Sequence, residues 1–449
     1  MSNRVSRRSV LQCGLAGLAA TILPRNVFGA NDKLHHACIG VGGMGGHDFG
    51  VFKGHPKVQI AAVCDVDRNS LDHAARQVPD ARKYADWREL VAKEGDKFDS
   101  VNVAVPDHTH AAATMTALRA KKHVYCQKPL CHDVAECRAV AQAAKAAGVV
   151  TQLGTQMASQ IGDRMAVQFL REGVVGKIQR AILCSNRTNA IQDYRLAGPR
   201  PRRGEKPPDS LAWDLWLGTA PVREYAPGIY HPTKWRAWLD FGTGWSGDIG
   251  CHIFDAVWKG LGLTAPKTVV AEVQKSWLES PERRADNWPQ GDHITWIFPG
   301  TDRTASELTL EWFDGEFFPP EDVRKMAEIE HYPEESAMLI GTEGAMLIPS
   351  GSGPLLRPSE KFKGHPRPKL PGRDHYHHFI EACLGGERTE SHFMQTGPMA
   401  EAILLGTVAV RVPGQTLEWD APNLRIPNSA DAQRLLRRTY RKGWAVEGL

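Results

Sequence analysis

The sequence lacks the cysteine patterns that hold metals or staple small domains. Its nine cysteines are scattered over 449 residues, and no two are spaced as Cys-x-x-Cys or in another zinc-binding pattern. Cys126, Cys131 and Cys137 have the character of small apolar side chains that fill a core. We therefore expect buried free thiols, no disulfide and no metal site.

The sequence also lacks an apolar run long enough to cross a membrane, which needs about 20 residues. The run from Leu11 to Leu23 is shorter, follows three arginines and ends near the small residues Gly29-Ala30, a pattern typical of a cleaved signal sequence. Ser6-Arg7-Arg8-Ser9-Val10-Leu11 resembles a twin-arginine export signal. We expect residues 1–30 to direct export to the periplasm through the twin-arginine machinery, with no stable membrane anchor; an amphipathic first helix is the alternative.

No excess of charge remains once this segment is removed. The formal net charge of the whole chain is +4, and residues 1–30 contain four arginines and no acidic residue. The remaining chain is neutral and offers no global electrostatic field for nucleic acid or anionic lipid. We therefore expect no nucleic-acid partner.

A glycine-rich turn follows the first strand-like segment, His36 to Ile39. The turn reads Gly40-Val41-Gly42-Gly43-Met44-Gly45 and leads into a predicted helix over 44–52 and a second strand over 58–64. Such glycines let backbone N–H groups approach a pyrophosphate at the positive end of a helix. Asp65 ends the second strand, where an acid that binds the adenosine ribose is expected. The pattern predicts NAD, because Asp65 would repel a 2′-phosphate, although Arg68 keeps NADP possible.

Helix-like and strand-like segments continue to alternate up to about residue 150. Helices are predicted over 86–94, 111–120 and 134–147, and strands over 101–105 and 124–126. This alternation is typical of a doubly wound parallel sheet. Ligands of such sheets bind beyond the carboxyl ends of the strands. Lys128, just after the last of these strands, is therefore a candidate for the chemistry.

A second candidate stretch lies far downstream, in Gly247-Asp248-Ile249-Gly250-Cys251-His252. Asp248 and His252 are four residues apart, which places them on one face of a helix. Together with Lys128 they form a proton-transfer set, with His252 as general base, Asp248 orienting it and Lys128 stabilising an alkoxide. The alternative is that His252 is a satisfied core residue.

Taken in order, these motifs resemble the Gfo/Idh/MocA oxidoreductase family, which includes glucose–fructose oxidoreductase and inositol dehydrogenase. The shared motifs are Gly-x-Gly-x-x-Gly, Cys-Asp-Val-Asp, Val-Pro-x-x-x-His, Lys-His-Val-x-Cys-Gln-Lys-Pro-Leu and Asp-x-Gly-x-His-x-x-Asp. The resemblance implies an α/β fold: an N-terminal Rossmann domain with a doubly wound parallel sheet, and a C-terminal α+β domain on a large open, mainly antiparallel sheet. The outer face of that second sheet commonly makes the contacts of a homo-oligomer, a dimer or tetramer.

The resemblance also assigns cofactor-binding positions to Pro106, His110, Gln127 and Gln156. One departure stands out, because the family's usual Glu-Lys-Pro is Gln127-Lys128-Pro129 in this chain. Glutamine keeps the hydrogen bonding but loses a negative charge beside Lys128.

A chain of 449 residues is too long for one ordinary core. We expect a signal peptide over 1–30, an NAD(P)-binding Rossmann domain over 34–155, an α+β substrate and oligomerisation domain over 156–425, and a closing segment over 426–449.

Residues 213–258 contain six of the thirteen tryptophans. Aromatic faces can stack on sugar rings, although most tryptophans are core residues. The candidates for binding a carbohydrate are Trp235, Arg236 and Trp245, followed by Tyr230 and His231.

The leading hypothesis is reversible hydride transfer between NAD(P) and a secondary hydroxyl of a sugar, cyclitol or related polyol. Free NAD is scarce outside the cytoplasm, so we expect a tightly bound cofactor. One alternative is a glycosidase that uses tightly held NAD for transient oxidation and elimination. Another is a non-catalytic NAD-dependent sensor, which would be expected to lose Lys128 or His252, and both are present.

Overall fold

The computed structural model describes residues 33–187 and 203–449. The predicted signal sequence lies outside these residues. The first sheet has six strands, all parallel, in the order β3-β2-β1-β4-β5-β6, which confirms the predicted doubly wound Rossmann sheet. Its strands are β1 (Leu34–Ile39), β2 (Val58–Cys64), β3 (Arg82–Tyr84), β4 (Ser100–Val103), β5 (His123–Cys126) and β6 (Thr151–Leu153).

Polar caps set the ends of the crossover helices. Asp67 and Asp86 accept hydrogen bonds from backbone N–H groups in the first turns of α3 and α4, and Gly148 ends α6 in the left-handed conformation. These helices are α2 (Gly43–Gly54), α3 (Arg68–Ala75), α4 (Trp87–Glu94), α5 (Asp107–Arg119) and α6 (Val134–Ala147).

Helix α5 begins four residues before the predicted start at residue 111. Pro106 occupies the N-cap position and Asp107 supplies an acid in the first turn, both of which favour a helix start. The earlier start places His110 within the first turn of the helix rather than ahead of it.

The second sheet has eight strands in the order β13-β12-β11-β7-β10-β9-β8-β14. Only β10 and β7 pair in parallel, and the other pairs are antiparallel, as predicted. Its strands are β7 (Ile178–Ser185), β8 (Thr268–Val273), β9 (Asp292–Pro299), β10 (Thr304–Asp314), β11 (Glu335–Gly341), β12 (Ala345–Pro349), β13 (Leu355–Arg357) and β14 (Leu417–Glu418).

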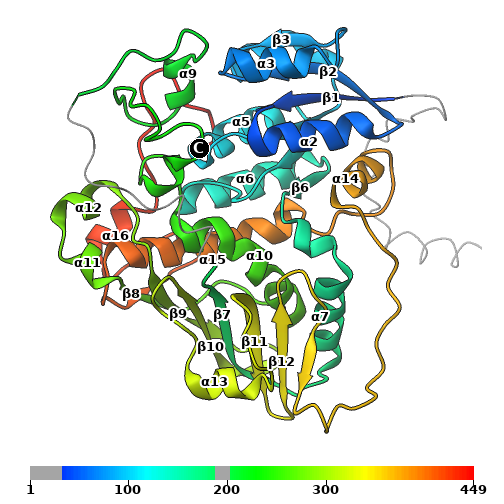
Figure 1. Cartoon of the computed structure of the whole chain (residues 1–449), viewed down its shortest axis with the longest axis vertical. Coiled ribbons are helices and arrows are strands. Elements are labelled where there is room, and N and C mark those ends of the chain that lie inside the picture. Colours follow the sequence, from blue (N-terminus) through cyan, green and yellow to red (C-terminus); the bar gives the residue numbers. More distant parts are fainter. Residues whose placement is uncertain (1–32, 188–202) are drawn as a thin grey trace, which may run out of the picture. The chain divides into compact units, whose positions relative to one another are not determined.

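Two long helices, α10 (Gly244–Leu261) and α15 (Phe393–Arg411), lie between the two sheets (Figure 1). Ile294, Trp296 and Phe298 alternate along β9 and are fully buried in the same cluster as residues of both helices. Among the described residues, α15 is the one helix long and apolar enough to cross a membrane, yet 83% of that stretch is buried inside the fold. It is accordingly the core helix of this domain.

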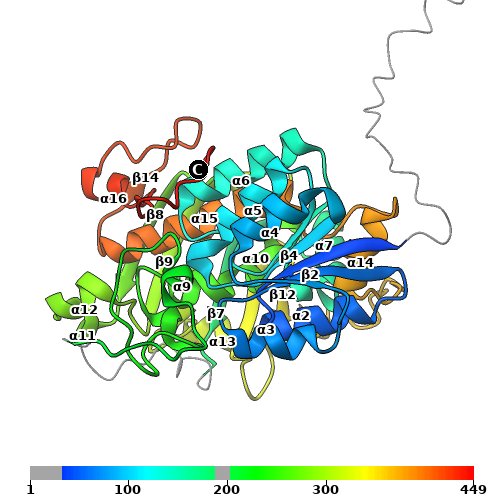
Figure 2. The same cartoon turned by 90° about the horizontal axis from the view of Figure 1, so that it is seen from above.

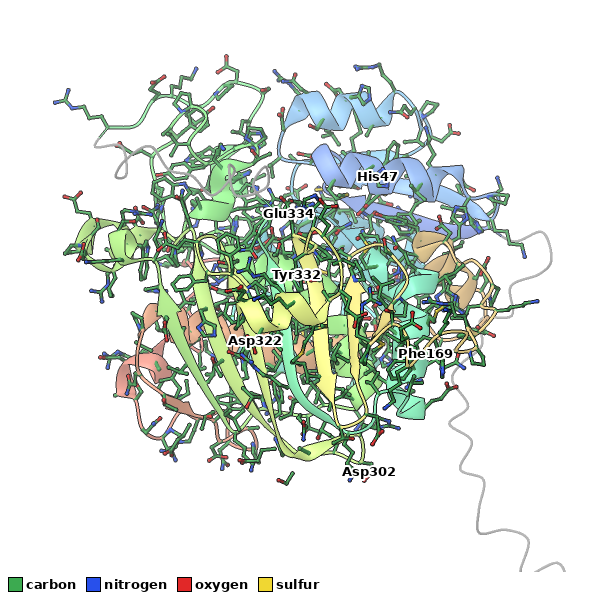
Figure 3. The ribbon with its side chains drawn as sticks, turned by 60° about the horizontal axis from the view of Figure 1, so that its bottom comes forward. His47, Phe169, Asp302, Asp322, Tyr332 and Glu334 are labelled. Atoms are coloured by element: carbon green, nitrogen blue, oxygen red, sulfur yellow. The ribbon has the colours of Figure 1, made fainter. Side chains whose placement is uncertain are left out.

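The opposite face of the second sheet carries a smaller apolar cluster that includes Ile182, Met338 and Leu347. Helix α13 (Glu321–Met326) contributes Val323 to it, and Tyr332 packs against it. Figure 3 shows this side, with Asp322 of α13, Tyr332 and Glu334 in front of the strands. The remaining helices of the described residues are η1 (Gly95–Lys97), η2 (Gln156–Ser159), α7 (Ile161–Glu172), α9 (Trp213–Leu217), η4 (Lys234–Ala237), α11 (Lys275–Leu278), α12 (Pro281–Asp286), α14 (His375–Cys383) and α16 (Ala430–Arg434).

Two segments from the second half of the chain return to the first sheet. Helix α14 packs on α2 (Figures 1 and 2). The stretch before α9 pairs with the loop between β2 and α3, where Ala212 donates its N–H to Val66 and Arg68 donates its N–H to Ser210. The eight cysteines of the described residues are free and buried.

The close approach of α15 to the sheet makes Gly406 a sensitive position. A Cβ atom added there would overlap the Trp296 ring, whose indole N–H donates to the Ala402 carbonyl at 2.9 Å. We expect Gly406→Ala to lower the free energy of unfolding by about 1–3 kcal/mol, the usual cost of overpacking. Chemical denaturation measures it. The matched control is Gly50→Ala on α2, where nothing lies within 4 Å of the new Cβ; equal stability of the two variants would contradict the packing.

Candidate active site

The glycine turn forms an uncapped helix start that fits a pyrophosphate. Gly40 has a φ of +85°, and a Cβ there would overlap the backbone of Ala104 at the end of β4. A Cβ on Gly45 would overlap the Gly40 carbonyl, so α2 can begin this close to the strand only with glycine. No side chain caps α2, its first turn has no acidic residue, and Gly43 and Met44 are exposed. The first N–H groups of the helix are thus available to an anion.

Asp65 lies at the end of β2, beside the turn. Its carboxylate accepts the N–H groups of Val41 and Asp67, both at 2.9 Å. Burial raises the pKa of Asp65, and these two hydrogen bonds oppose the shift. His231 lies 3.8 Å from Asp67, and Arg68 is exposed at the start of α3. His231 therefore belongs to the side of the site where the adenosine ribose is expected, and not to the surroundings of Lys128.

Lys128 and Asp248 meet across the two halves of the chain. The ammonium of Lys128, two residues after β5, lies 2.6 Å from Oδ1 of Asp248, in the second turn of α10. Arg236 donates to the other carboxylate oxygen at 3.3 Å, and its guanidinium lies 4.3 Å from the centre of the Trp235 ring. The Lys128 side chain is 17% exposed and that of Asp248 4% exposed. The carboxylate of Asp248 thus binds two cations.

His252 lies one turn further along α10, and its Nδ1 atom is buried without a hydrogen-bond partner. Burial, followed by the positive charge of Lys128, lowers the pKa of His252 to about 3, against the opposing effect of Asp248. The imidazole is therefore neutral at physiological pH and has a lone pair to offer. It also lines a small cavity with Asp163 and Ser336, to which Lys128 does not contribute.

Sequence reasoning missed Asp107, a buried acid beside this group. Burial, and then the negative charge of Asp248, raise the pKa of Asp107 to about 7, while Arg236 and Lys128 oppose the rise. Its described hydrogen bond comes from the Thr243 hydroxyl at 3.1 Å. The only sequence signal was its position directly after Pro106, at a strand-to-helix junction.

The other predicted cofactor residues are bonded mainly to the protein. Gln127 donates its amide to Asp48, Gln156 donates to Tyr376 at 3.0 Å, and His110 is buried between two backbone carbonyls. Gln156 is half-buried, as is Pro106 at the N-cap of α5. These side chains surround the ends of β4, β5 and β6, where the nicotinamide end of a dinucleotide is expected.

The aromatic candidates are packed inside the protein. Tyr230 is 1% exposed, Trp235 6% and Trp245 5%. The Trp245 N–H donates to the Ser185 carbonyl at 2.9 Å, and Arg236 lies over the Trp235 ring. Of Trp235, Arg236 and Trp245, Arg236 has the most exposed side chain, at 27%.

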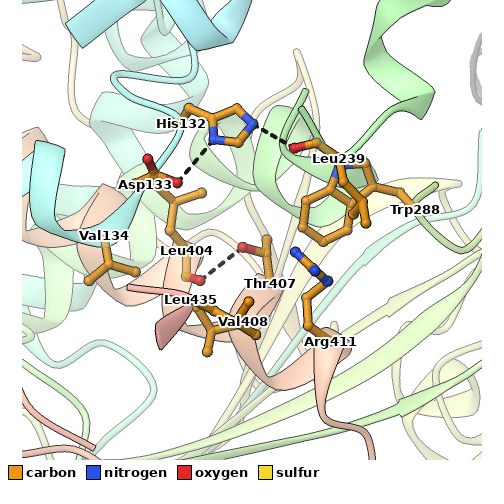
Figure 4. Close-up of a pocket in the computed structure, with 10 residues that line it drawn as sticks. All are labelled: His132, Asp133, Val134, Leu239, Trp288, Leu404, Thr407, Val408, Arg411 and Leu435. Atoms are coloured by element: carbon orange, nitrogen blue, oxygen red, sulfur yellow. Dashed lines mark hydrogen bonds and ion pairs between the residues drawn. The ribbon is translucent and has the colours of Figure 1, made fainter. Parts of the chain in front are cut away.

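A separate cavity opens between the start of α6 and the end of α15 (Figure 4). His132 bonds Asp133 and the Leu239 carbonyl, both at 3.0 Å, and Thr407 donates to the Leu404 carbonyl. Most of its polar groups are thus satisfied within the protein. In the part of the chain that the structure describes, no group of three histidine, cysteine or acidic side chains is placed to hold a metal.

The protein combines this sheet order, the glycine turn and the acid after β2 with a second domain that faces the lysine after β5. This combination defines a two-domain dinucleotide-binding protein. A family model described as an oxidoreductase family with an NAD-binding Rossmann fold matches residues 34–155, and the model of its C-terminal alpha/beta domain matches residues 166–294. The chain belongs to the Gfo/Idh/MocA oxidoreductase family.

Named relatives match over part of their length. The 2,7-anhydro-N-acetylneuraminate hydratase of Escherichia coli is 28% identical over 161 residues, which are 36% of this chain and 41% of the relative. Levoglucosan dehydrogenase of Pseudarthrobacter phenanthrenivorans is 25% identical over 210 residues, which are 47% of this chain and 43% of the relative. The chain thus spans about two fifths of the curated relatives that it matches.

A solved structure shares the fold over most of the chain. It is an inositol dehydrogenase homologue from Azotobacter vinelandii, complexed with NADH and myo-inositol. The TM-score is 0.56 at 16% identity, and the match covers 87% of this chain and 98% of the other.

The raised pKa of Asp107 predicts that the stability of the folded protein depends on pH through this residue. The folded protein holds this proton more tightly than the unfolded chain does, so the contribution of Asp107 to stability falls as pH rises from about 4 to about 7. Asp107→Asn removes the titration and keeps an acceptor for Thr243. We expect the free energy of unfolding of the variant, relative to wild type, to rise across this window by at most about 4 kcal/mol. Its melting temperature relative to wild type should rise with it. Calorimetry between pH 4 and pH 8 measures it.

The control for this experiment is Asp80→Asn, a substitution of an exposed acid. Its melting temperature, measured over the same pH range, gives the effect of losing an exposed carboxylate. A difference for Asp107→Asn that varies with pH no more than that of Asp80→Asn would contradict the raised pKa.

Proposed function

We propose that this protein is an NAD-dependent oxidoreductase that transfers a hydride between the nicotinamide and a secondary hydroxyl of a sugar, cyclitol or related polyol. The observation that carries the proposal is the contact of Lys128 with Asp248 at 2.6 Å, with His252 one turn further along α10. It joins the end of β5, where the reactive end of a dinucleotide is expected, to a helix of the second domain.

Each residue of the site has a separate role in the reaction of the hydroxyl. NAD, when bound along the glycine turn and Asp65, supplies the hydride acceptor. The Lys128 ammonium donates a hydrogen bond to the reacting oxygen and stabilises the negative charge that develops there. His252, neutral in the free protein, accepts the hydroxyl proton. The negative charge of Asp248 offsets the imidazolium that results and keeps the Lys128 ammonium in place.

We propose that a segment of the second domain helps to retain the cofactor. The stretch before α9 bonds to the loop between β2 and α3 through Ala212 and Arg68, and His231 stands beside Asp67. Both contacts lie next to Asp65, which is expected to hold the adenosine ribose. A chain segment tied down there supports the proposal of a tightly bound NAD, and Asp65 itself favours NAD over NADP by charge.

A redox-neutral reaction is the second candidate, and one relative supports it. The matched protein from Escherichia coli is named as a hydratase and not as a dehydrogenase. In such a reaction the hydride would leave the sugar and return to it after elimination, as in the glycosidase alternative. The same three residues would serve both reactions, since each begins by oxidising a hydroxyl.

We also propose that the protein forms a homo-oligomer through the outer face of the second sheet. The segment next to this face exposes large apolar side chains, among them Phe318, Met326 and Ile329 at 57%, 41% and 36%. Exposed apolar side chains gathered on one face are typical of an interaction surface.

Substitution of Lys128 or His252 tests the catalytic assignment. We expect Lys128→Met and His252→Ala to lower kcat by about 10²–10⁴-fold, because each removes a group that acts on the reacting proton or oxygen. The affinity for NADH, followed by its fluorescence, should stay close to wild type. Activity is measured as NADH formation with levoglucosan and myo-inositol, and as aglycone release from chromogenic glycosides.

Lys145→Met and His73→Ala are the matched controls, since both residues are exposed and lie outside the site. Wild-type turnover in either site variant would refute the assignment. Aglycone release without net NADH would select the redox-neutral reaction, and NAD found in protein purified without added cofactor would support tight binding.

We further propose export to the periplasm through the twin-arginine pathway, on the basis of Ser6-Arg7-Arg8-Ser9-Val10-Leu11. Substitution of both Arg7 and Arg8 by lysine should leave the full-length protein in the cytoplasm, because the pathway reads the paired arginines. Cell fractionation followed by mass measurement of the N-terminus checks it. Arg4→Lys serves as the control and should be exported like wild type; export of the double variant would reject the proposal.

A further inference from the structure

Lys128 is held from both sides by buried ionisable residues that the mechanism does not use. The residue before it, Gln127, bonds to Asp48 on α2, and the residue after it, Pro129, bonds through its carbonyl to His110 on α5. Both helices begin at turns beside the expected cofactor site. The backbone on each side of the lysine is thus tied to one of them.

The contact between Gln127 and Asp48 has the geometry of a matched pair. The amide nitrogen of Gln127 lies 3.0 Å and 2.9 Å from the two carboxylate oxygens of Asp48. Asp48 is fully buried and Gln127 is 5% exposed. Burial raises the pKa of Asp48 to about 6, while hydrogen bonds from Gln127 and Tyr376 and the charge of His47 oppose the rise. Gln127 therefore serves as the donor that a buried carboxylate requires.

The departure of the sequence from Glu-Lys-Pro has a physical reason in this contact. A glutamate at position 127 would place a second carboxylate about 3 Å from Asp48, and two carboxylates at that distance cannot both be ionised. Room to avoid the contact is small, because the Gln127 side chain also packs against Gly154. This contact therefore has a single carboxylate, that of Asp48 on α2, and none from position 127 after β5.

His110 fixes the opposite side. Its ring nitrogens lie 2.6 Å from the Pro129 carbonyl and 2.7 Å from the Val105 carbonyl. Carbonyl oxygens only accept, so both nitrogens must donate and the ring is an imidazolium. Burial lowers the pKa of His110, but the interactions with Cys126 and the two carbonyls raise it above its ordinary value overall. Because Pro129 is fixed in this way, a displacement of Gln127 changes the position of Lys128, which lies between the two residues.

We propose that Asp48 is a positioning residue that sets the place of the Lys128 ammonium by anchoring Gln127. The proposal rests on the proposed function of Lys128. It means that a residue of the cofactor-binding helix sets the position of the lysine that acts on the substrate oxygen.

A charge exchange between the two positions tests the proposal. Gln127→Glu should displace the lysine loop and lower kcat by about 10²-fold, the cost of a misplacement near 1 Å, with little change in KM or in NADH affinity. Asp48→Asn combined with Gln127→Glu restores one donor and one acid in the reverse order. The double variant should return kcat to within about threefold of wild type.

A second measurement reports on Lys128 without any substrate. Reductive methylation with ¹³C-formaldehyde labels the lysines, and the Lys128 signal is assigned by its loss in Lys128→Met. The signal should shift in Gln127→Glu and return in the double variant. Lys145 provides the control signal, which should not move.

The outcomes separate this proposal from the proposed function. If wild type oxidises no sugar, the function fails, and the Lys128 signal still decides the positioning. A Gln127→Glu variant that loses thermal stability but keeps both kcat and the Lys128 signal would show that the pair is only structural, which overturns the proposal. A double variant as impaired as Gln127→Glu in both measurements would also overturn it.

Discussion

The salt bridge between Lys128 and Asp248 is the interaction on which the rest of the site depends. The two residues are 120 positions apart in the chain and their side chains lie 2.6 Å apart. An ion pair this buried has a desolvation cost that its own attraction does not necessarily recover, so the surroundings must hold it. Arg236 binds the other oxygen of Asp248, and the neighbours of Lys128 are bonded to Asp48 and His110. The parallel sheet and α10 are thereby joined at the position where chemistry is expected.

Around this ion pair, burial and neighbouring charges shift the pKa values of Asp107 and His252 in opposite directions. Asp248 faces two cations, whereas Asp107, buried and facing Asp248, has its pKa raised to about 7. His252 is kept neutral by burial and by the charge of Lys128. Separation of pKa values between neighbouring groups is how sites assign acid and base roles. The charge of Lys128 acts on both groups, because it opposes the rise in the pKa of Asp107 and lowers the pKa of His252.

The sequence predicted the first domain closely because its signals are local. The predicted strand over 58–64 and helix over 134–147 coincide with β2 and α6, since apolar runs and caps are read within a few residues. The short β3 and most strands of the second sheet gave no such signal. Their pairing depends on residues far apart, as in the parallel pair of β10 and β7, and no local pattern encodes that.

The site shows the same limit at the level of single contacts. The i, i+4 spacing of Asp248 and His252 lies within α10, so both face one side of it, yet the carboxylate bonds to Lys128 and Arg236, two cations outside the helix, and Nδ1 of His252 has no hydrogen-bond partner. Spacing along a helix gives proximity, but the strongest opposite charge within reach decides the partner. The change from glutamate to glutamine at position 127 is read in the same way. In the sequence, the change removes a negative charge beside Lys128. In the fold, Asp48 of α2 places a carboxylate against the side chain of Gln127.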